Sequence, residues 1–154
     1  MKVLVTGNKG YIGAHLEEAL IEKYGKENVF GLDEVSDPSE DLCRDAFEAF
    51  KQKGIKFDVI FHLAAYPRVQ WSVENPHLSL YNNIVSSMNV FEYARENDCR
   101  VVYSGSSSVI GNGKGPESPY ALSKLVPEAI GQMYAKLYGL DFVTLRYFNV
   151  YYGS

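Results

Sequence analysis

Cysteine is scarce in this sequence, and its two thiols, Cys43 and Cys99, stand alone among 154 residues. Isolated cysteines exclude a disulfide framework and a cysteine-rich metal site, so we expect no metal and a cytoplasmic protein. Positive charge is not in excess either, because 15 Lys and Arg stand against 19 Asp and Glu, for a net charge of −4. Without a basic field, neither nucleic acid nor an anionic membrane is an expected partner. No apolar run reaches the roughly 18 residues of a membrane span, and the N-terminus lacks the layout of a signal peptide.

What the sequence does contain is a regular alternation of short apolar runs and helical stretches, in a length typical of one domain. Strands are predicted at 2–6, 28–33, 57–64, 100–104 and 141–147, and helices at about 11–24, 46–54, 76–97 and 119–138. Such alternation favours an α/β fold, in which helices cover both faces of a doubly wound parallel sheet of Rossmann type. We expect about five strands in the order 3-2-1-4-5, with a ligand beyond their carboxyl ends.

The connection between the first predicted strand and the first helix is rich in glycine. Gly7, Gly10 and Gly13 form a G-x-x-G-x-x-G pattern, which is a variant of the dinucleotide-binding fingerprint. The first glycine permits a tight turn, the second lets the backbone approach a pyrophosphate, and the third lets the helix pack closely on the strand. A plain glycine-rich turn is the alternative, but the position between a strand and a helix favours phosphate binding.

Asp33 ends the second predicted strand, 20 residues after Gly13. A carboxylate at this place accepts hydrogen bonds from the ribose hydroxyls of adenosine and repels a 2′-phosphate. The nearest following arginine is Arg44, so NAD is favoured over NADP. The alternative is a solvated loop aspartate.

Tyr120 and Lys124 lie one helical turn apart at the start of the last predicted helix, so the phenol and the ammonium share a face. Tyr-x-x-x-Lys pairs are common on protein surfaces. Here, however, the pair follows a dinucleotide turn and a serine-rich strand end at 104–108. A serine hydroxyl at that edge would lie over the nicotinamide site.

These features together resemble the extended short-chain dehydrogenase/reductase family, and within it the NAD-dependent epimerase/dehydratase group that acts on nucleotide sugars. The resemblance covers nearly all of the chain. The matching positions are residues 6–13, Asp33, Asp41 with Leu42, residues 62–65, the pattern of Val69, Ser72 and Pro76, Asn83, Ser106 with Val109 and Gly111, Tyr120 with Lys124, and residues 145–150.

The resemblance implies a role for particular residues in this chain. NAD would be bound by Gly7, Gly10, Tyr11, Ile12, Gly13, Asp33, Asp41, Leu42, Leu63, Ala64, Ala65, Asn83, Tyr120, Lys124 and Phe148. The implied catalytic residues are Ser106, Tyr120 and Lys124, and the implied contacts to the nucleotide-sugar substrate are Ser106, Tyr120 and Asn149. His62 lies inside a strand in this motif, which implies a structural role.

The resemblance also implies a 4-epimerase type of reaction. The Lys124 ammonium and the nicotinamide charge would favour the phenolate of Tyr120, which removes a proton from the sugar 4-hydroxyl while hydride passes to NAD. Ser106 would donate a hydrogen bond to the same oxygen, and the keto sugar would rotate and take the hydride back on its other face. Ser107 and Ser108 stand where 4,6-dehydratases carry Asp-Glu, which counts against dehydration, since the departing hydroxyl needs an acid.

Members of this group usually run to about twice this length. We therefore expect residues 1–154 to be a truncated NAD-binding Rossmann domain that lacks a C-terminal substrate domain. The alternatives are a free-standing NAD-binding module without full activity, or a nucleotide-sugar reductase or dehydratase of the same family. The helices near 76–97 and 119–138 resemble a pair that forms a dimer interface, so a homodimer is one expectation, and mere coverage of the sheet is the other.

Overall fold

The structure is a computed structural model that describes residues 1–33 and 42–151. In this part of the chain, five parallel strands form one sheet in the order β2-β1-β3-β4-β5. The strands are β1 (Val3–Thr6), β2 (Val29–Leu32), β3 (Val59–His62), β4 (Arg100–Ser106) and β5 (Phe142–Tyr147). Val3 is in register with Val29 on one side and with Val59 on the other.

The predicted α/β architecture is confirmed, but the predicted strand order 3-2-1-4-5 is wrong for the described residues. The third strand pairs directly with β1, so β1 lies between β2 and β3. The burial of the two strands explains this placement. Ile60 and His62 of β3 are buried, whereas Gly31 of β2 is exposed, and a strand with exposed residues suits the edge of a sheet.

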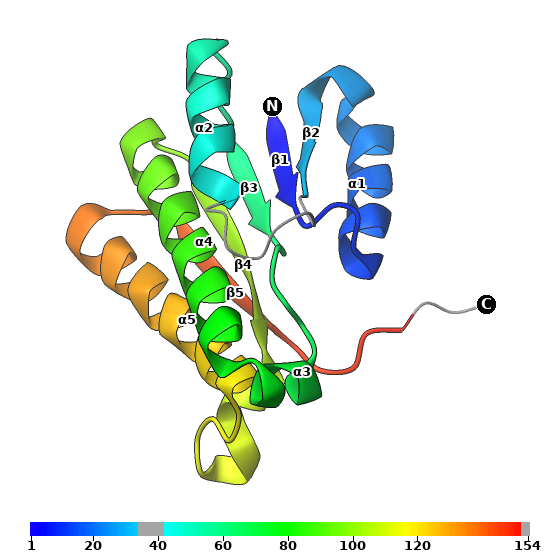
Figure 1. The fold of residues 1–154 in the computed structure, drawn as a ribbon. Helices are drawn as coiled ribbons and strands as arrows, with labels where there is room; N and C mark the ends of the chain where they lie inside the picture. Colours follow the sequence, from blue (N-terminus) through cyan, green and yellow to red (C-terminus); the bar gives the residue numbers. More distant parts are fainter. Residues whose placement is uncertain (34–41, 152–154) are drawn as a thin grey trace.

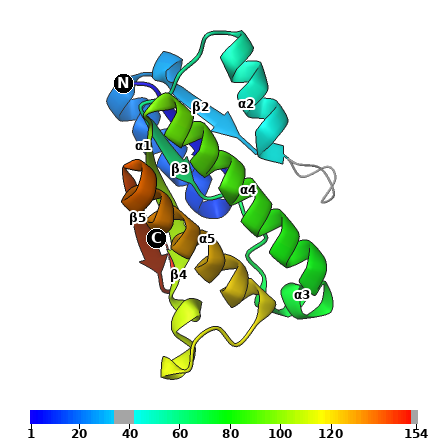
Figure 2. The same ribbon diagram turned by 90° about the vertical axis from the view of Figure 1, so that its left-hand side faces the viewer.

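Helices connect the strands and form two layers around the sheet. The helix α1 (Tyr11–Tyr24) covers one face, and α2 (Leu42–Gln52), α4 (Pro76–Asn97) and α5 (Pro119–Tyr138) cover the other (Figure 1, Figure 2). Three short helices lie in the connections: η1 (Lys26–Asn28), α3 (Val69–Glu74) and η2 (Ser107–Gly113). None of the helices in residues 1–33 and 42–151 combines the length and the apolarity that a membrane span needs.

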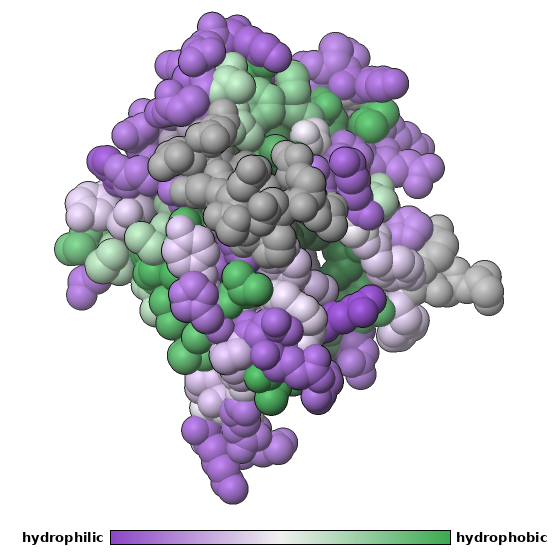
Figure 3. Space-filling view, in the orientation of Figure 1, coloured by the Kyte–Doolittle hydropathy of each residue, from purple (hydrophilic) through white to green (hydrophobic). Residues whose placement is uncertain are grey.

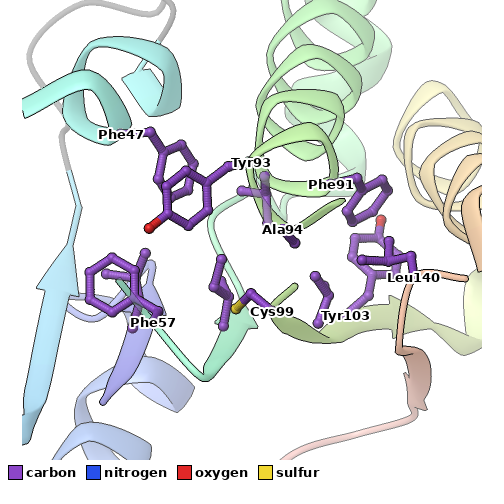
Figure 4. Close-up of a cluster of buried hydrophobic side chains, with 12 residues drawn as sticks. Phe47, Phe57, Phe91, Tyr93, Ala94, Cys99, Tyr103 and Leu140 are labelled. Carbon is purple, nitrogen blue, oxygen red and sulfur yellow. The ribbon is translucent and has the colours of Figure 1, made fainter. Parts of the chain in front are cut away.

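The alternation of side chains along β1 divides the core between these layers. Val3 and Val5 pack with Leu20 of α1, whereas Leu4 points to the opposite face and joins a larger cluster. This second cluster includes Phe47 of α2, Phe57 just before β3, Phe91 of α4 and Tyr103 of β4, which meet between the helices and the sheet (Figure 4).

The ends of the two long helices follow from local chemistry, and both agree with the predicted ranges 76–97 and 119–138. Pro76 and Pro119 occupy the first helical position, where a missing N–H has no consequence. The Ser118 hydroxyl accepts a hydrogen bond from the Ala121 amide and caps α5, which ends at Gly139 in the left-handed conformation.

Candidate functional site

A cavity of about 720 Å³ lies beyond the carboxyl ends of the central strands, between the turn after β1 and the helices α4 and α5. The space-filling view shows a hollow with apolar atoms inside it near the centre of the molecule (Figure 3). Because β2 and β3 lie on opposite sides of β1, this edge is the switch point of the sheet, where α/β proteins commonly bind ligands.

The cavity brings together every predicted site residue that the structure describes. The residues on its wall include Gly7, Gly10, Tyr11, Ile12, Gly13, Asp33, Leu63, Ala64, Ala65, Asn83, Ser106, Tyr120, Lys124, Phe148 and Asn149. Asp41 and the side chain of Leu42 lie outside the described residues.

The glycine turn is packed so tightly that side chains would not fit at two of its positions. Gly7 has a φ of +76°, and a Cβ there would come within 2.8 Å of the Ala64 nitrogen. A Cβ at Gly13 would come within 2.0 Å of the Gly7 carbonyl oxygen. No side chain caps the start of α1 at Gly10, so the helix presents its first amides toward the cavity, where an anion is favoured.

Asp33 lies beside this turn and is bound to it. The Lys9 amide donates a hydrogen bond of 2.8 Å to Asp33 Oδ2. The Gly7 amide donates to the Leu32 carbonyl, also at 2.8 Å. The carboxylate is therefore fixed at the cavity wall, and its remaining lone pairs can accept hydrogen bonds from a ligand.

Asn83 of α4 connects the loop after β3 to α5. Its Oδ1 accepts from the Tyr66 amide at 2.8 Å, and its Nδ2 donates to the Tyr66 carbonyl at 3.3 Å and to Ser123 Oγ at 2.9 Å. Both amide hydrogens of Asn83 are thus used within the protein. The side chain holds the loop that carries Leu63 and Ala64, and a cofactor contact would use the second lone pair of Oδ1.

Lys124 is buried one turn after Tyr120 on α5. Its Nζ donates a hydrogen bond of 2.9 Å to the Ser104 carbonyl and lies 5.2 Å from the ring centre of Tyr103. Burial lowers the pKa of Lys124 to about 8, because an ammonium loses its hydration in the interior. The group remains mostly protonated at neutral pH and provides a positive charge at the base of the cavity.

Ser106 is the last residue of β4, and its hydroxyl caps η2. Its Oγ accepts from the Ser108 amide at 3.2 Å and lies 2.8 Å from the Ser108 hydroxyl. When Ser108 donates in that pair, the proton of Ser106 is free to be donated into the cavity.

Several wall residues were not predicted from the sequence. Tyr66, Tyr81, Asn82, Ser86 and Tyr147 also line the cavity. Tyr147 belongs to β5, and Asn82 and Ser86 lie one helical turn apart on α4, with Tyr81 just before them. That spacing was the available signal, but only the packing of α4 on the sheet shows which face meets the cavity. In residues 1–33 and 42–151, no three His, Cys, Asp or Glu residues gather where they could hold a metal ion.

Comparison with known proteins agrees with this geometry. The model of the NAD dependent epimerase/dehydratase family matches residues 3–152. The chain belongs to this family. The uncharacterized UDP-glucose epimerase YtcB of Bacillus subtilis (strain 168) is 34% identical over an alignment that covers 98% of this chain and 57% of YtcB.

The fold of this chain resembles solved structures of epimerases and dehydrogenases. A crystal structure of UDP-galactose 4-epimerase has a TM-score of 0.78 at 32% identity, covering 95% of this chain and 55% of that one. The structure of L-threonine dehydrogenase from Phytophthora infestans has a TM-score of 0.84 at 25% identity, with 96% and 53% coverage. The chain therefore spans about half the length of the relatives it matches, and the predicted family and fold class are confirmed.

Proposed function

We propose that the cavity binds NAD, and that residues 1–154 form the NAD-binding domain of a longer nucleotide-sugar epimerase of the 4-epimerase type. The amides at the start of α1 and the turn from Gly7 to Gly13 would bind the pyrophosphate, and Asp33 would accept hydrogen bonds from the ribose. Asn82 supports the fit, because its Nδ2 is buried on the cavity wall without a hydrogen-bond partner in the described residues.

The remaining cofactor contacts are assigned by position. Leu63, Ala64, Ala65 and Asn83 would line the cofactor along β3 and α4, and Tyr120, Lys124 and Phe148 would surround the nicotinamide end. Asp41 and Leu42 are assigned to the adenine from the family pattern alone. NAD, when bound, would supply a hydride acceptor that returns the hydride.

The protein side of the reaction falls to three residues at the base of the cavity. Tyr120 would take the proton of a substrate hydroxyl, Ser106 would donate a hydrogen bond to the same oxygen, and the ammonium of Lys124 would stabilise negative charge there. Asn149, which follows β5 on the cavity wall, would contact the sugar.

One observation carries this proposal: Ser106, Tyr120 and Lys124 share a cavity with the glycine turn, although they come from β4 and α5. Asp33 is the sole carboxylate among the described wall residues, and it lies at the turn rather than at the serine-rich strand end. Epimerisation or simple oxidation is therefore favoured over dehydration, which needs an acid beside the departing hydroxyl.

A free-standing NAD-binding module is the second candidate. The size of the cavity, about 720 Å³, favours it, because a nucleotide sugar needs more binding surface than this cavity offers once a dinucleotide is bound. In either case we propose a cytoplasmic location, because Cys99 is a free thiol, the state in which a reducing compartment keeps cysteines.

We also propose that the partner is a second copy of the chain, bound through α4 and α5. Met88 of α4 and Met133 and Leu137 of α5 are exposed apolar residues, and Figure 3 shows apolar atoms gathered on that side. Sedimentation equilibrium tests this. A dimer that Leu137→Glu converts to a monomer supports the proposal, and a wild-type monomer at high protein concentration contradicts it.

Calorimetry tests the main proposal, with NAD and NADP titrated into the chain, into Tyr120→Phe and into the control Tyr138→Phe. Tyr138 is exposed and lies outside the cavity. We expect NAD to bind all three within roughly twofold of one another. Turnover is then measured with UDP-, GDP- and dTDP-sugars and with L-threonine, and Tyr120→Phe should abolish it. Turnover in the wild type that Tyr120→Phe abolishes supports the epimerase. NAD binding without turnover agrees with a cofactor-binding half and with a module alike, and absence of dinucleotide binding refutes both candidates.

A further inference from the structure

The short helix α3 contacts two tyrosines of the cavity wall through two consecutive side chains. The Trp71 ring stacks on the Tyr66 ring, with centroids 4.8 Å apart and an interplanar angle of 24°. Ser72 is completely buried, and its hydroxyl donates to the Val69 carbonyl at 2.6 Å. The same oxygen accepts a hydrogen bond of 3.0 Å from the amide of Tyr120. Figure 2 shows α3 at the end of the molecule where α5 begins.

The contact with Ser72 completes the first turn of α5. A helix leaves its first amides without partners inside the helix. In α5, Pro119 has no amide hydrogen, and Ser118 accepts from the amides of Ala121 and Leu122. The amide of Tyr120 is the remaining one in this turn, and its partner comes from α3, 48 positions earlier in the chain.

The carbonyl of Tyr120 is held from the other side. Ser123 Oγ donates to it at 2.7 Å, and Asn83 Nδ2 donates to Ser123 at 2.9 Å. Asn83 also binds both main-chain groups of Tyr66. The main chain of Tyr120 is thus connected through buried side chains to the loop that lines the cavity after β3.

We propose that Ser72 is a positioning residue that fixes the main chain of Tyr120, and hence the place of its phenol in the cavity. This rests on the proposed function, in which the Tyr120 hydroxyl meets the substrate oxygen beside the cofactor. Without the Ser72 hydroxyl, the amide of Tyr120 is left unpaired, and the first turn of α5 relaxes toward water or toward α3. The phenol then loses its fixed position relative to the cofactor, although the walls that bind the cofactor stay intact.

The test compares Ser72→Ala with Ser79→Ala in the complete chain. Ser79 is also fully buried, but its hydroxyl has no hydrogen-bond partner in the described residues and it lies outside the cavity wall. In Ser72→Ala we expect the Tyr120 amide to exchange with solvent about tenfold faster, while the Ala121 amide is unchanged. In Ser79→Ala both amides should exchange as in the wild type. Ser72→Thr keeps the acceptor oxygen and should restore slow exchange at Tyr120.

A second measurement separates positioning from a general structural role. In chains with ¹³C-labelled tyrosine, the Tyr120 ring signal, assigned through Tyr120→Phe, should shift when NAD is added. Ser72→Ala should reduce that shift to less than roughly half, with NAD affinity within about twofold of the wild type. Equal effects of the two alanine variants would overturn the proposal, and so would a wild-type Tyr120 amide that exchanges as fast as an exposed amide. Absence of NAD binding would count against the proposed function alone, because the exchange rates still decide the role of Ser72.

Discussion

The hydroxyl of Thr6 and the Nδ1 atom of His62 lie 2.7 Å apart in the interior, where β1 and β3 end side by side. The positions of the protons follow from their partners. Thr6 Oγ1 accepts from the amides of Leu63 and Ala64, so its own proton goes to His62 Nδ1. The Nε2 proton of His62 then points to Ser87 Oγ of α4, 3.0 Å away. The histidine joins three elements behind the cavity as a neutral ring, in agreement with the structural role expected from the sequence.

A pH dependence of stability follows from this arrangement. Burial, reinforced by the charge of Lys124, lowers the pKa of His62 from 6.5 to about 3. Below pH 6.5, His62 is protonated in the unfolded chain but stays neutral in the folded chain. The stability that the neutral ring contributes above pH 6.5 is therefore lost as the pH falls toward 3. We expect this group to lower the free energy of unfolding by about 2 kcal/mol between pH 7 and pH 5.

Urea unfolding at pH 7, 6 and 5 measures this loss. The variant His62→Gln can keep both hydrogen bonds but cannot gain the proton, so its stability should fall less steeply with acid. His77→Gln removes an exposed imidazole and serves as the control. Identical slopes for the wild type and His62→Gln would show that acid acts through other groups.

Two glycines of the turn should respond differently to alanine. A Cβ at Gly13 would meet the Gly7 carbonyl oxygen at 2.0 Å, so Gly13→Ala must shift α1 from β1 and should lower the free energy of unfolding by about 2–4 kcal/mol. Gly10 has a φ of −74°, and the nearest atom to a Cβ there is 3.3 Å away. Gly10→Ala should therefore fold with a loss below about 1 kcal/mol, yet bind NAD at least roughly tenfold more weakly, because the methyl group occupies the cavity wall.

Thermal unfolding and calorimetry with NAD distinguish these outcomes. Gly54→Ala provides the control for a glycine replacement away from the cavity wall. Its φ of +66° makes alanine unfavourable there, but no atom lies within 4 Å of a Cβ, so this variant should lose some stability and keep full NAD affinity. Full NAD affinity in a folded Gly10→Ala chain would remove the turn from the proposed binding site.

The parts of the site that could be predicted from the sequence are local ones. The glycine turn lies within seven consecutive positions, and Tyr120 and Lys124 are one helical turn apart, so spacing alone predicts that each set acts together. The contact between Ser72 and Tyr120 could not be predicted in this way, because it joins segments 48 positions apart. The predicted strand order was wrong for the same reason. The order depends on which strand β3 pairs with, and the residue pattern within a strand does not specify its neighbour.

Asp33 should determine the choice between the two dinucleotides. Asp33→Ala removes the acceptor for the Lys9 amide and the proposed acceptor for the ribose, and it should end the repulsion of a 2′-phosphate. We expect NAD affinity to fall roughly tenfold and the preference over NADP to shrink by at least as much. Asp33→Asn keeps an oxygen for Lys9 but loses the charge, so it should relax the preference with a smaller loss of NAD affinity. An unchanged ratio of the two affinities in Asp33→Ala would place the adenosine elsewhere.

The buried ammonium of Lys124 should lower the free energy of unfolding, although the residue is proposed to act in the site. Burial lowers its pKa from 10.5 to about 8, so the unfolded chain holds the proton more readily, and the free energy of unfolding rises as the pH rises from 8 to 10.5. Lys124→Met removes the buried charge together with its hydrogen bond to the Ser104 carbonyl. We expect the variant to be about 1–2 kcal/mol more stable than the wild type at pH 7, with the difference falling away by pH 10. Urea unfolding at both pH values measures the change in the free energy of unfolding, and calorimetry measures the NAD affinity of the variant. A variant less stable than the wild type at pH 7 would show that the contact with Ser104 outweighs the desolvation of the ammonium.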